Sequence, residues 1–428
     1  MGFGNRIDEI SSVKGERREN KEMNPLSTKK SILLGFGMFG VVVLSLIFIG
    51  APLQGKLGMV GLLLTELIFL ALAIGGVLLT KDSFKEVFPF KIPTLSQTIA
   101  ALILWAGTYL LVVFATIVTG YFFPDALNQT TSGMNGLMAS IPFWARFLIV
   151  AVSPAICEEA IHRGFILHHL KPMGKKWLVV LVMGVLFGVF HLDPTRFLTT
   201  GILGAIMTYV ALETDNMFYP MLIHFVNNAL SVISTKITEG IESIDETYEM
   251  AVTLSTVGVY MMILCMTPWL LWVGVKLLHP KMQEMEELKR NVVKKRFICA
   301  VISLACLVGG GVITAWGITS NRIVSDMRTV ALTELSQTPS SYDFTIEEAG
   351  TYELIAVINT PEELLAVGIT DTAGNVVHEF AASQLTANFF LELKAGSYHM
   401  EVSCINYEGE FSVKPESMGT FNLVLQKR

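Results

Sequence analysis

A pair of adjacent glutamates lies inside an apolar stretch of this sequence, and histidines follow on two later apolar stretches. The residues concerned are Glu158, Glu159, Arg163, His191, His224 and Asn228. Ionisable side chains are costly at membrane depth, so a group of them within apolar segments marks a functional site by default. We therefore take these six residues as the candidates for chemistry.

Two hydrolytic chemistries fit these residue types. In the first, Glu158 and His191 activate a water molecule, while His224 and Asn228 donate hydrogen bonds to the oxyanion formed from a peptide bond. In the second, His191, His224 and the Glu158 carboxylate bind a zinc ion, whose bound water is the nucleophile. The sequence lacks a His-Glu-x-x-His helix, which favours the first chemistry, without a metal or other cofactor. Zinc stays the alternative.

The two glutamates have different neighbours on a helix. Glu159 and Arg163 are four residues apart, a spacing at which their side chains can meet, so this pair is expected to be structural. Glu158 projects about 100° away around the helix and has no obvious cationic partner. This difference makes Glu158 the candidate general base.

Composition places these residues in a membrane. Of the 428 residues, 52% are hydrophobic and 16% are charged, and the mean hydropathy is +0.55. A span needs about 20 apolar residues. We expect about nine transmembrane helices, at residues 31–53, 58–80, 99–122, 143–170, 177–192, 198–212, 217–234, 252–278 and 298–318.

The distribution of Lys and Arg predicts the orientation of the chain. With nine spans, the basic tail of residues 1–30 and the other basic loops fall on one side, which is then the cytoplasm. The membrane domain would cover residues 31–319, and the C-terminus would lie outside. Residues 320–428 carry 6 basic and 15 acidic side chains, which indicates a soluble region that avoids lipid headgroups and nucleic acid.

Helix geometry places the candidates at a similar depth. Glu158 lies thirteen residues before Lys171, or about 20 Å, and His191 lies fifteen residues after Lys176, or about 22 Å. His224 and Asn228 lie at comparable distances from the polar residues that precede their segment. We therefore expect these side chains to meet within the membrane.

Beyond residue 320 the pattern changes to short segments in which apolar and polar residues alternate. This period is typical of half-buried strands and predicts an all-β sandwich, outside the cytoplasm, for residues 320–428. A frame of Phe, five residues, Gly, one residue and Tyr occurs twice, at 344–352 and at 390–398. Each copy predicts a strand, a glycine turn and a second strand. The region resembles modules appended to bacterial surface proteins, for which an inert role and ligand binding are equally open.

The three motifs together resemble the CPBP intramembrane proteases, also called the Abi or CaaX-protease-like family. The match consists of Glu-Glu-x-x-x-Arg from Glu158, Phe187-x-x-x-His191 and His224-x-x-x-Asn228, within a core at residues 143–234. The resemblance implies that Glu158 and His191 activate water, that His224 and Asn228 form the oxyanion hole, and that the remaining two residues are supports. It also implies a membrane-embedded or membrane-associated protein substrate and, by analogy, a multi-pass protein of a bacterial plasma membrane.

Two other classes of function stay open. The same polar network would hold helices together in a non-catalytic scaffold or a bacteriocin-immunity protein, and intramembrane acids and histidines also relay protons in transporters. No inverted repeat supports a transporter.

Several further polar residues receive simpler interpretations. We expect His162 to pack, and His168, His169 and His279 to contact lipid headgroups near helix ends. Glu66 must face protein, as a support for the site, a partner of Arg146 or a neutral acid. The five cysteines form no disulfide framework, because four of them lie in apolar spans.

Overall fold

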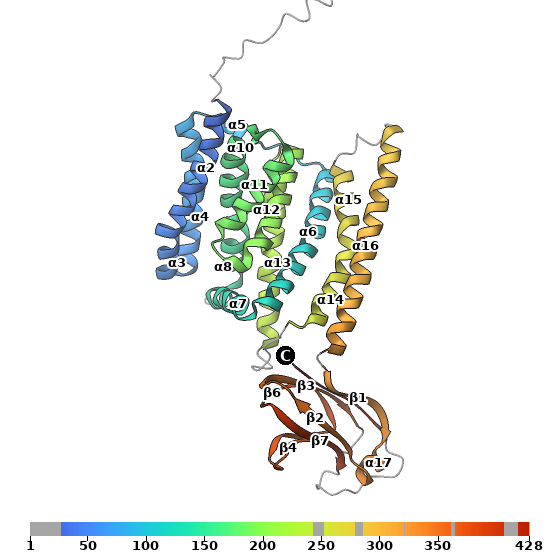
Figure 1. Ribbon diagram of the computed structural model, residues 1–428. Helices are drawn as coiled ribbons and strands as arrows, with labels where there is room; N and C mark the ends of the chain where they lie inside the picture. The colour runs from blue at the N-terminus through green and yellow to red at the C-terminus, as the bar shows by residue number, and fades with distance from the viewer. Residues whose placement is uncertain are drawn as a thin grey trace, which may run out of the picture. The chain divides into compact units, whose positions relative to one another are not determined.

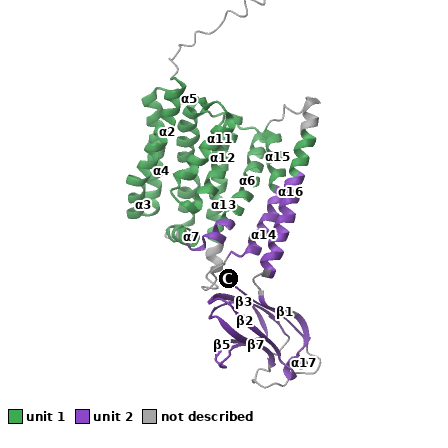
Figure 2. Cartoon of the chain, viewed as in Figure 1, with its two compact units in different colours: residues 1–116, 126–247, 267–299 green, residues 117–125, 248–266, 300–428 purple. Residues whose placement is uncertain are grey.

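The chain folds into helices up to residue 320 and mainly into strands beyond it (Figure 1). The computed structural model describes residues 27–139, 141–242, 252–278, 286–320, 322–360, 364–405 and 418–427. The chain forms two compact units. Unit 1 contains residues 1–116, 126–247 and 267–299, and unit 2 contains residues 117–125, 248–266 and 300–428 (Figure 2).

Six helical segments of the described chain are long and apolar enough to cross a membrane. Three of them are single helices: α4 (Met59–Thr80), α6 (Leu95–Phe122) and α12 (Pro194–Thr214). A fourth, Val292–Thr319, lies within α16 (Glu286–Ser320). The other two are composite: Thr28–Leu57 consists of α2 (Thr28–Ser45), a π-turn (Leu46–Gly50) and α3 (Ala51–Leu57), and Leu254–Leu278 consists of α14 (Leu254–Ile263), a 3₁₀ turn (Leu264–Met266) and α15 (Thr267–Leu278). A seventh span results if α7 (Pro124–Ala139) and the helix that follows, which meet at 120°, count as one. The protein is therefore a multi-pass membrane protein.

The predicted count of nine spans is not confirmed, although all nine predicted segments are helical. Helix α11 (Lys176–Phe190) has only 15 residues, fewer than the roughly 20 that a straight span needs. The other two segments that fall short are the helix at 143–170 and α13 (Phe218–Glu242), which carry the glutamate pair and the His224 motif. The polar side chains of the candidate site thus lower the apolarity of the helices that hold them. The orientation of the termini stays a prediction, and the tail up to residue 26 lies outside the described residues.

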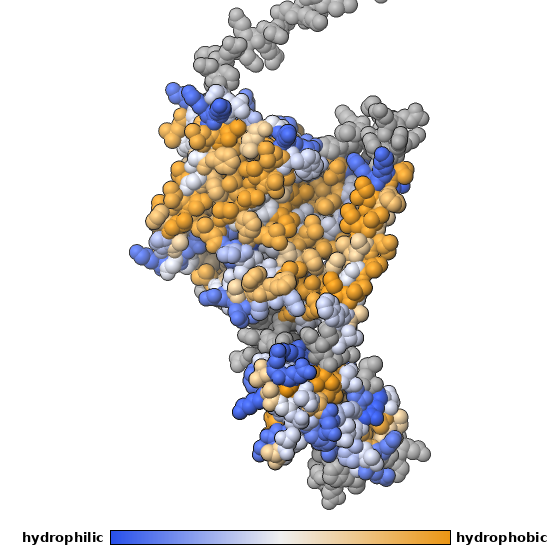
Figure 3. All heavy atoms as spheres, viewed as in Figure 1, coloured by the Kyte–Doolittle hydropathy of each residue, from blue (hydrophilic) through white to orange (hydrophobic). Residues whose placement is uncertain are grey.

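The surface of the helical segments supports a lipid environment. Apolar residues cover the face of these helices that is visible in Figure 3. Large side chains stand out from α2 and α4 and from the π-turn after α2; Leu33 is 72% exposed, Phe48 73% and Leu79 86%. A contiguous apolar surface of this extent is unfavourable in water and suits hydrocarbon.

Helices α11 and α12 pack closely because glycines lie at their contact. A Cβ atom on Gly188 would lie 2.6 Å from the carbonyl oxygen of Phe197, and one on Gly204 would lie 2.7 Å from the Cβ of Phe187. Neither position therefore admits a larger side chain without a shift of the backbone or of the neighbouring helix. This close packing holds the Phe187 ring against the helix that carries the glutamate pair.

The C-terminal strands form a sandwich of two antiparallel four-stranded sheets, with orders β1-β8-β3-β6 and β2-β7-β4-β5. The strands are β1 (Arg322–Ala331), β2 (Ser340–Ile346), β3 (Gly350–Asn359), β4 (Leu364–Asp371), β5 (Val376–Ala382), β6 (Gln384–Leu393), β7 (Gly396–Ile405) and β8 (Met418–Lys427), with a short helix α17 (Leu332–Gln337) after β1. One apolar core contains buried residues of both sheets, among them Leu354, Val367 and Leu423. The sandwich predicted from period-2 alternation is confirmed, and its location outside the cytoplasm stays a prediction.

The repeated Phe-x₅-Gly-x-Tyr frame forms a strand, a turn and a strand in both copies, as predicted. The two strands within a copy do not pair with each other. Instead β2 pairs with β7, with Phe344 opposite Tyr398, and β3 pairs with β6, with Gly350 opposite Leu393. Each turn therefore carries the chain from one sheet to the other, so that both strands of a copy contribute apolar residues to the shared core.

Candidate active site

The first motif lies on one irregular helix with two π-helical stretches. In order, it comprises α8 (Phe143–Arg146), a π-turn (Phe147–Val152), α9 (Ser153–Glu159), a second π-turn (Ala160–Ile166) and α10 (Leu167–Leu170). Such π-turns occur frequently at functional sites. Pro154 has no N–H to donate, so the carbonyl of Val150, four residues earlier, lacks its usual helical partner. The side-chain amide of Asn228 donates to this carbonyl at 2.9 Å, which ties α13 to the first motif.

A buried chain of charged contacts joins Arg163, Glu159 and His224. Arg163 Nη1 donates to Glu159 Oε1 at 2.7 Å, and Arg163 Nη2 donates to the carbonyl of Gly204 at 2.9 Å. His224 Nδ1 lies 2.9 Å from the same Glu159 oxygen. The side chains of Glu159 and Arg163 are fully buried. The predicted pairing of these two residues is confirmed, and it positions the His224 ring as well.

Glu158 lies on the other side of this ring. Its Oε2 atom is 3.9 Å from His224 Nε2 and is buried without a hydrogen-bond partner among the described residues. Glu66 of α4, which is 2% exposed, lines the same cavity as Glu158, and its Oε2 atom is likewise buried without a hydrogen-bond partner among the described residues. The structure therefore places a second buried acid close to Glu158.

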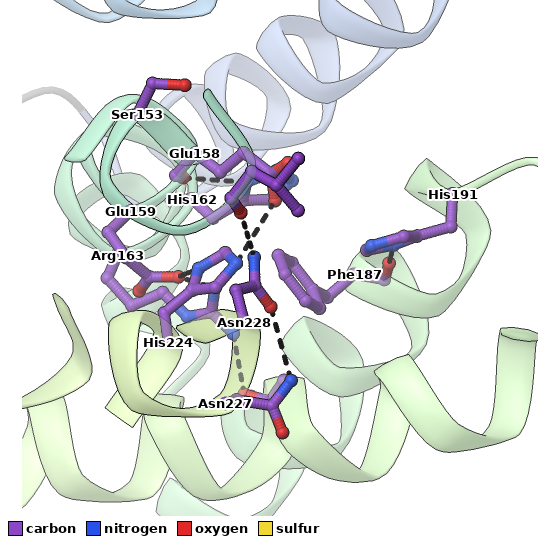
Figure 4. Close-up of polar contacts among 12 residues, drawn as sticks. Ser153, Glu158, Glu159, His162, Arg163, Phe187, His191, His224, Asn227 and Asn228 are labelled. Atoms are coloured by element: carbon purple, nitrogen blue, oxygen red, sulfur yellow. Dashed lines mark hydrogen bonds and ion pairs between the residues drawn. The ribbon is translucent and has the colours of Figure 1, made fainter. Parts of the chain in front are cut away.

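The ring of Phe187 is the centre of the cluster. The imidazoles of His162, His191 and His224 stand edge-on to it, with ring centroids 5.1, 5.0 and 5.8 Å away, and the Arg163 guanidinium carbon lies 4.4 Å from its centroid. Figure 4 shows Phe187 between His191 and His224, with the His191 ring directed toward the cluster. This position gives the phenylalanine of the second motif a physical role: it separates the two candidate histidines.

The hydrogen bonds of both histidines fix which ring nitrogen is available. His191 Nδ1 lies 2.8 Å from the Phe187 carbonyl, which can only accept, so Nδ1 carries a hydrogen and Nε2 is free to accept a proton. His224 Nδ1 donates to Glu159 in the same way. Its Nε2 atom can therefore donate to an oxyanion only when the ring is a cation.

Helix α11 ends just before His191, at a sharp reversal of the chain. Leu192 has a φ of 53°, in the left-handed region, and Asp193 Oδ1 accepts a hydrogen bond from the backbone N–H of Thr195 at the start of α12. Asp193 caps the N-terminus of α12, and Pro194 is its first residue. His162 is fully buried, with Nδ1 2.9 Å from the Glu158 carbonyl, which agrees with the predicted packing role.

All four predicted catalytic residues line one cavity of about 210 Å³ within unit 1. Its polar lining comprises Gln54, Thr65, Glu66, Glu158, His191, Arg196, Thr200, His224, Asn227 and Asn228. A second cavity of about 430 Å³, lined mainly by α6, α7, α12 and α13, shares Arg196, Thr200, Asn227 and Asn228 with the first. The two cavities therefore lie next to each other, with polar side chains between them.

Five polar lining residues were not identified from the sequence: Gln54, Thr65, Arg196, Thr200 and Asn227. Asn227 donates to Asn228 Oδ1 at 3.3 Å and so helps to orient that amide. Arg196 lies in the first turn of α12. A cation beside an apolar segment is visible in the sequence and can indicate a functional residue, but Arg196 belongs to none of the three motifs. Gln54 has no spacing relation to the motifs, so only the fold reveals it.

The zinc alternative requires three donor atoms close to one another. Among the described residues, only Asp82, His168 and His169 bring three such atoms within 4.8 Å of one another. Both candidate histidines present a free Nε2 with Nδ1 held by an acceptor, which suits metal ligands chemically. Because His191 and His224 lie on either side of the Phe187 ring, the donors as positioned do not form a three-ligand site.

The comparisons with known proteins concern the segment that carries the motifs. Residues 140–230 match the family model described as Rce1-like, type II CAAX prenyl endopeptidase. No curated protein matches the chain. The family match supports a membrane-embedded protease. The resemblance to the CPBP or CaaX-protease-like family is thus confirmed for the segment that contains the glutamate pair, the two histidines and Asn228.

Proposed function

We propose that this protein is an intramembrane endopeptidase that hydrolyses peptide bonds of membrane-associated proteins or peptides. The observation that carries the proposal is the single cavity lined by Glu158 of α9, by His191 at the C-terminal cap of α11, and by His224 and Asn228 of α13. The residue types and the free atoms in that cavity suit water activation and oxyanion binding. The match of residues 140–230 to a family of endopeptidases supports the same activity.

In the proposed mechanism, Glu158 and His191 activate the water. His191 Nε2 or the Glu158 carboxylate takes the proton as the oxygen attacks the scissile carbonyl, and that proton later passes to the leaving amine. The imidazolium of His224 and the second N–H of the Asn228 amide donate to the oxyanion. Glu159, Arg163 and Phe187 hold these groups in position and do not react.

The substrate must offer an extended segment, because the peptide groups of an intact helix are already hydrogen-bonded. The second cavity, with hydroxyl and amide side chains on α7 and α13, would bind the freed backbone groups of such a segment. A C-terminal prenylated peptide of the CAAX type is one substrate to test, because the matched family model is named for that class. The bacterial plasma membrane, with the N-terminus in the cytoplasm and the β-sandwich outside, is the setting that we propose; the sandwich would bind a ligand or partner there.

The decisive experiment compares purified full-length protein with Glu158→Gln and His191→Ala variants. The substrates are CAAX-type prenylated peptides and single-span membrane peptides in lipid nanodiscs. Removing a general base should lower the cleavage rate by about 10²- to 10⁴-fold. Glu379→Gln, which alters an exposed glutamate of the sandwich, should cleave at the wild-type rate. Equal rates for wild type and Glu158→Gln, with thermal unfolding unchanged, would contradict the proposal.

Two alternatives remain distinguishable from this proposal. A non-catalytic scaffold or immunity protein would cleave none of the peptides and would give the same cellular phenotype with wild type and Glu158→Gln. The zinc-dependent version of the protease would lose its activity on chelation and regain it with added Zn²⁺. Chelation must be interpreted together with the cluster at Asp82, which lies outside the active-site cavity.

A further inference from the structure

A second group of metal-type donors lies in unit 1, outside the active-site cavity. Asp82 follows the end of α4, and His168 and His169 lie on α10. Their donor atoms all lie within 4.8 Å of one another, and Asp82 Oδ2 is 3.1 Å from His169 Nε2. The expectation that His169 contacts lipid headgroups is wrong, since this ring is only 1% exposed. His279 lies outside the described residues.

The hydrogen bonds around His169 determine where its hydrogen lies. Ser31 Oγ donates to the backbone carbonyl of His169 at 3.1 Å, so its own hydrogen is used there. His169 Nδ1 lies 3.2 Å from the same Ser31 oxygen and must be the donor in that contact. In the neutral ring, Nε2 therefore carries a lone pair that faces the Asp82 carboxylate.

This buried nitrogen has no hydrogen-bond partner among the described residues, although the Asp82 oxygen is near. Two acceptors 3.1 Å apart repel each other unless a proton or a cation lies between them. The contact has the length but not the direction of a hydrogen bond. Ligands of a tetrahedral ion at 2.0–2.1 Å are about 3.3 Å apart, so the observed separation suits a shared metal ion.

The remaining members of the cluster lie next to His169. The His168 ring centroid is 5.1 Å from that of His169. Thr80 Oγ1 donates to Asp82 and fixes the carboxylate. The cation Lys171 is near the cluster and would repel a metal ion. Its ammonium group lies 3.6 Å from the Asp215 carboxylate, whose negative charge offsets part of this repulsion.

We propose that Asp82, His168 and His169 bind a divalent transition-metal ion, for which Zn²⁺ is the natural probe. Two histidines and one carboxylate are a common zinc ligand set, and water would complete the coordination. The ion would connect α4 and α10 and, through Ser31, the first span. It would stabilise the helices around the site without taking part in hydrolysis.

The test measures metal binding by the full-length protein in detergent after removal of bound metal. Wild type should take up one Zn²⁺ per chain by elemental analysis, and one Co²⁺ with a ligand-field absorption band. The Asp82→Asn/His168→Ala double variant should bind at least about tenfold more weakly. The control variant is Asp215→Asn, which removes a carboxylate that contacts Lys171 but is not a member of the cluster. This variant should bind Zn²⁺ as tightly as wild type does. The Glu158→Gln/His191→Ala variant should also keep the metal, which makes this test independent of cleavage.

Three results would overturn the proposal. If wild type binds no metal, Asp82 and His169 form only an ion pair. Binding retained in the Asp82→Asn/His168→Ala variant would place the ion elsewhere. Loss of the metal in the Glu158→Gln/His191→Ala variant would place it in the active-site cavity and would favour the zinc protease.

Discussion

Charged side chains are buried in the helices of unit 1, here called the helical unit, whereas those of the β-sandwich lie mainly at its surface. In the helical unit, Glu159 and Arg163 are fully buried and joined to His224. In the sandwich, the Asp326–Arg328 and Asp343–His399 pairs lie at its surface, with at least one partner well exposed. Exposed pairs add little to stability, whereas an isolated buried charge is costly. The buried charges of the helical unit are therefore costly and are not needed for folding, so we expect the chemistry at Glu159, Arg163 and His224 and their neighbours.

One residue of the sandwich departs from this rule. Glu353 of β3 is only 7% exposed, and its carboxylate accepts hydrogen bonds from Asn388 at 2.8 Å and from Gln426 at 2.9 Å. Its partners are neutral amides, and no nucleophile or base accompanies it among these contacts. Burial of a carboxylate is therefore insufficient to indicate a reactive site; convergence with histidines in a cavity is the additional condition.

The largest effect on stability should come from Arg163→Met. This change leaves the Glu159 carboxylate buried with His224 as its remaining partner, so unfolding of the helical unit should become easier by about 3–5 kcal/mol. Hydrogen exchange followed by mass spectrometry reports this loss separately for each unit. The matched control is Arg328→Met, whose side chain is 43% exposed and whose loss should cost less than about 1 kcal/mol. If Arg163→Met and Arg328→Met lost the same amount of hydrogen-exchange protection, the proposed difference between buried and exposed ion pairs would be wrong.

An intermediate effect is expected for Glu353→Ala. The substitution leaves two amide side chains without their acceptor, which should destabilise the sandwich by about 1–3 kcal/mol and leave the exchange of the helical unit unchanged. Glu392→Ala on the adjacent strand is the control, because that carboxylate is exposed where it accepts from Thr351. If cleavage of a membrane peptide also fell in Glu353→Ala, the separation between the site and the sandwich would be wrong.

The smallest effect concerns pH and the loop between α12 and α13. The hydrogen bond from Lys91, with Lys171 also near, holds the pKa of Asp215 below its ordinary value. A lowered pKa contributes stability above the unfolded value of about 3.9, and this contribution is lost as the pH falls through the lower native pKa. Both side chains are more than half exposed, so the contribution should stay under about 1 kcal/mol. The difference in unfolding free energy between wild type and Lys91→Met should therefore be constant above pH ~5 and shrink on acidification; a difference that grows on acidification would contradict this assignment.

Much of the site was predictable because helical spacing is local. Glu159 and Arg163 pair at four residues as expected, and His224 and Asn228 lie one turn apart on α13. The position of Glu66 was not predictable, since Glu158, which lines the same cavity, lies ninety-two residues away and three roles were open for Glu66.

The spans and the histidines near helix ends show where local reasoning was insufficient. Apolar runs indicated nine spans, but α11 is short, and neither the helix with the glutamate pair nor α13 is by itself apolar enough to count as a span. His169 looked like a headgroup contact because basic residues follow it. In the fold, Ser31 and Asp82 enclose its ring, and neither was close to it in sequence.

By itself, the sequence determined the membrane setting, the three motifs with their internal spacing, and the alternation that produces a sandwich, because each depends on residues only a few positions apart. Only the tertiary structure decided that Phe187 separates His191 from His224, that Glu66 lines the same cavity as Glu158, and that the glycine turns of the sandwich link two sheets. These relations depend on how close the helices and strands come to one another. That distance is set by packing against glycines and aromatic rings far apart along the chain.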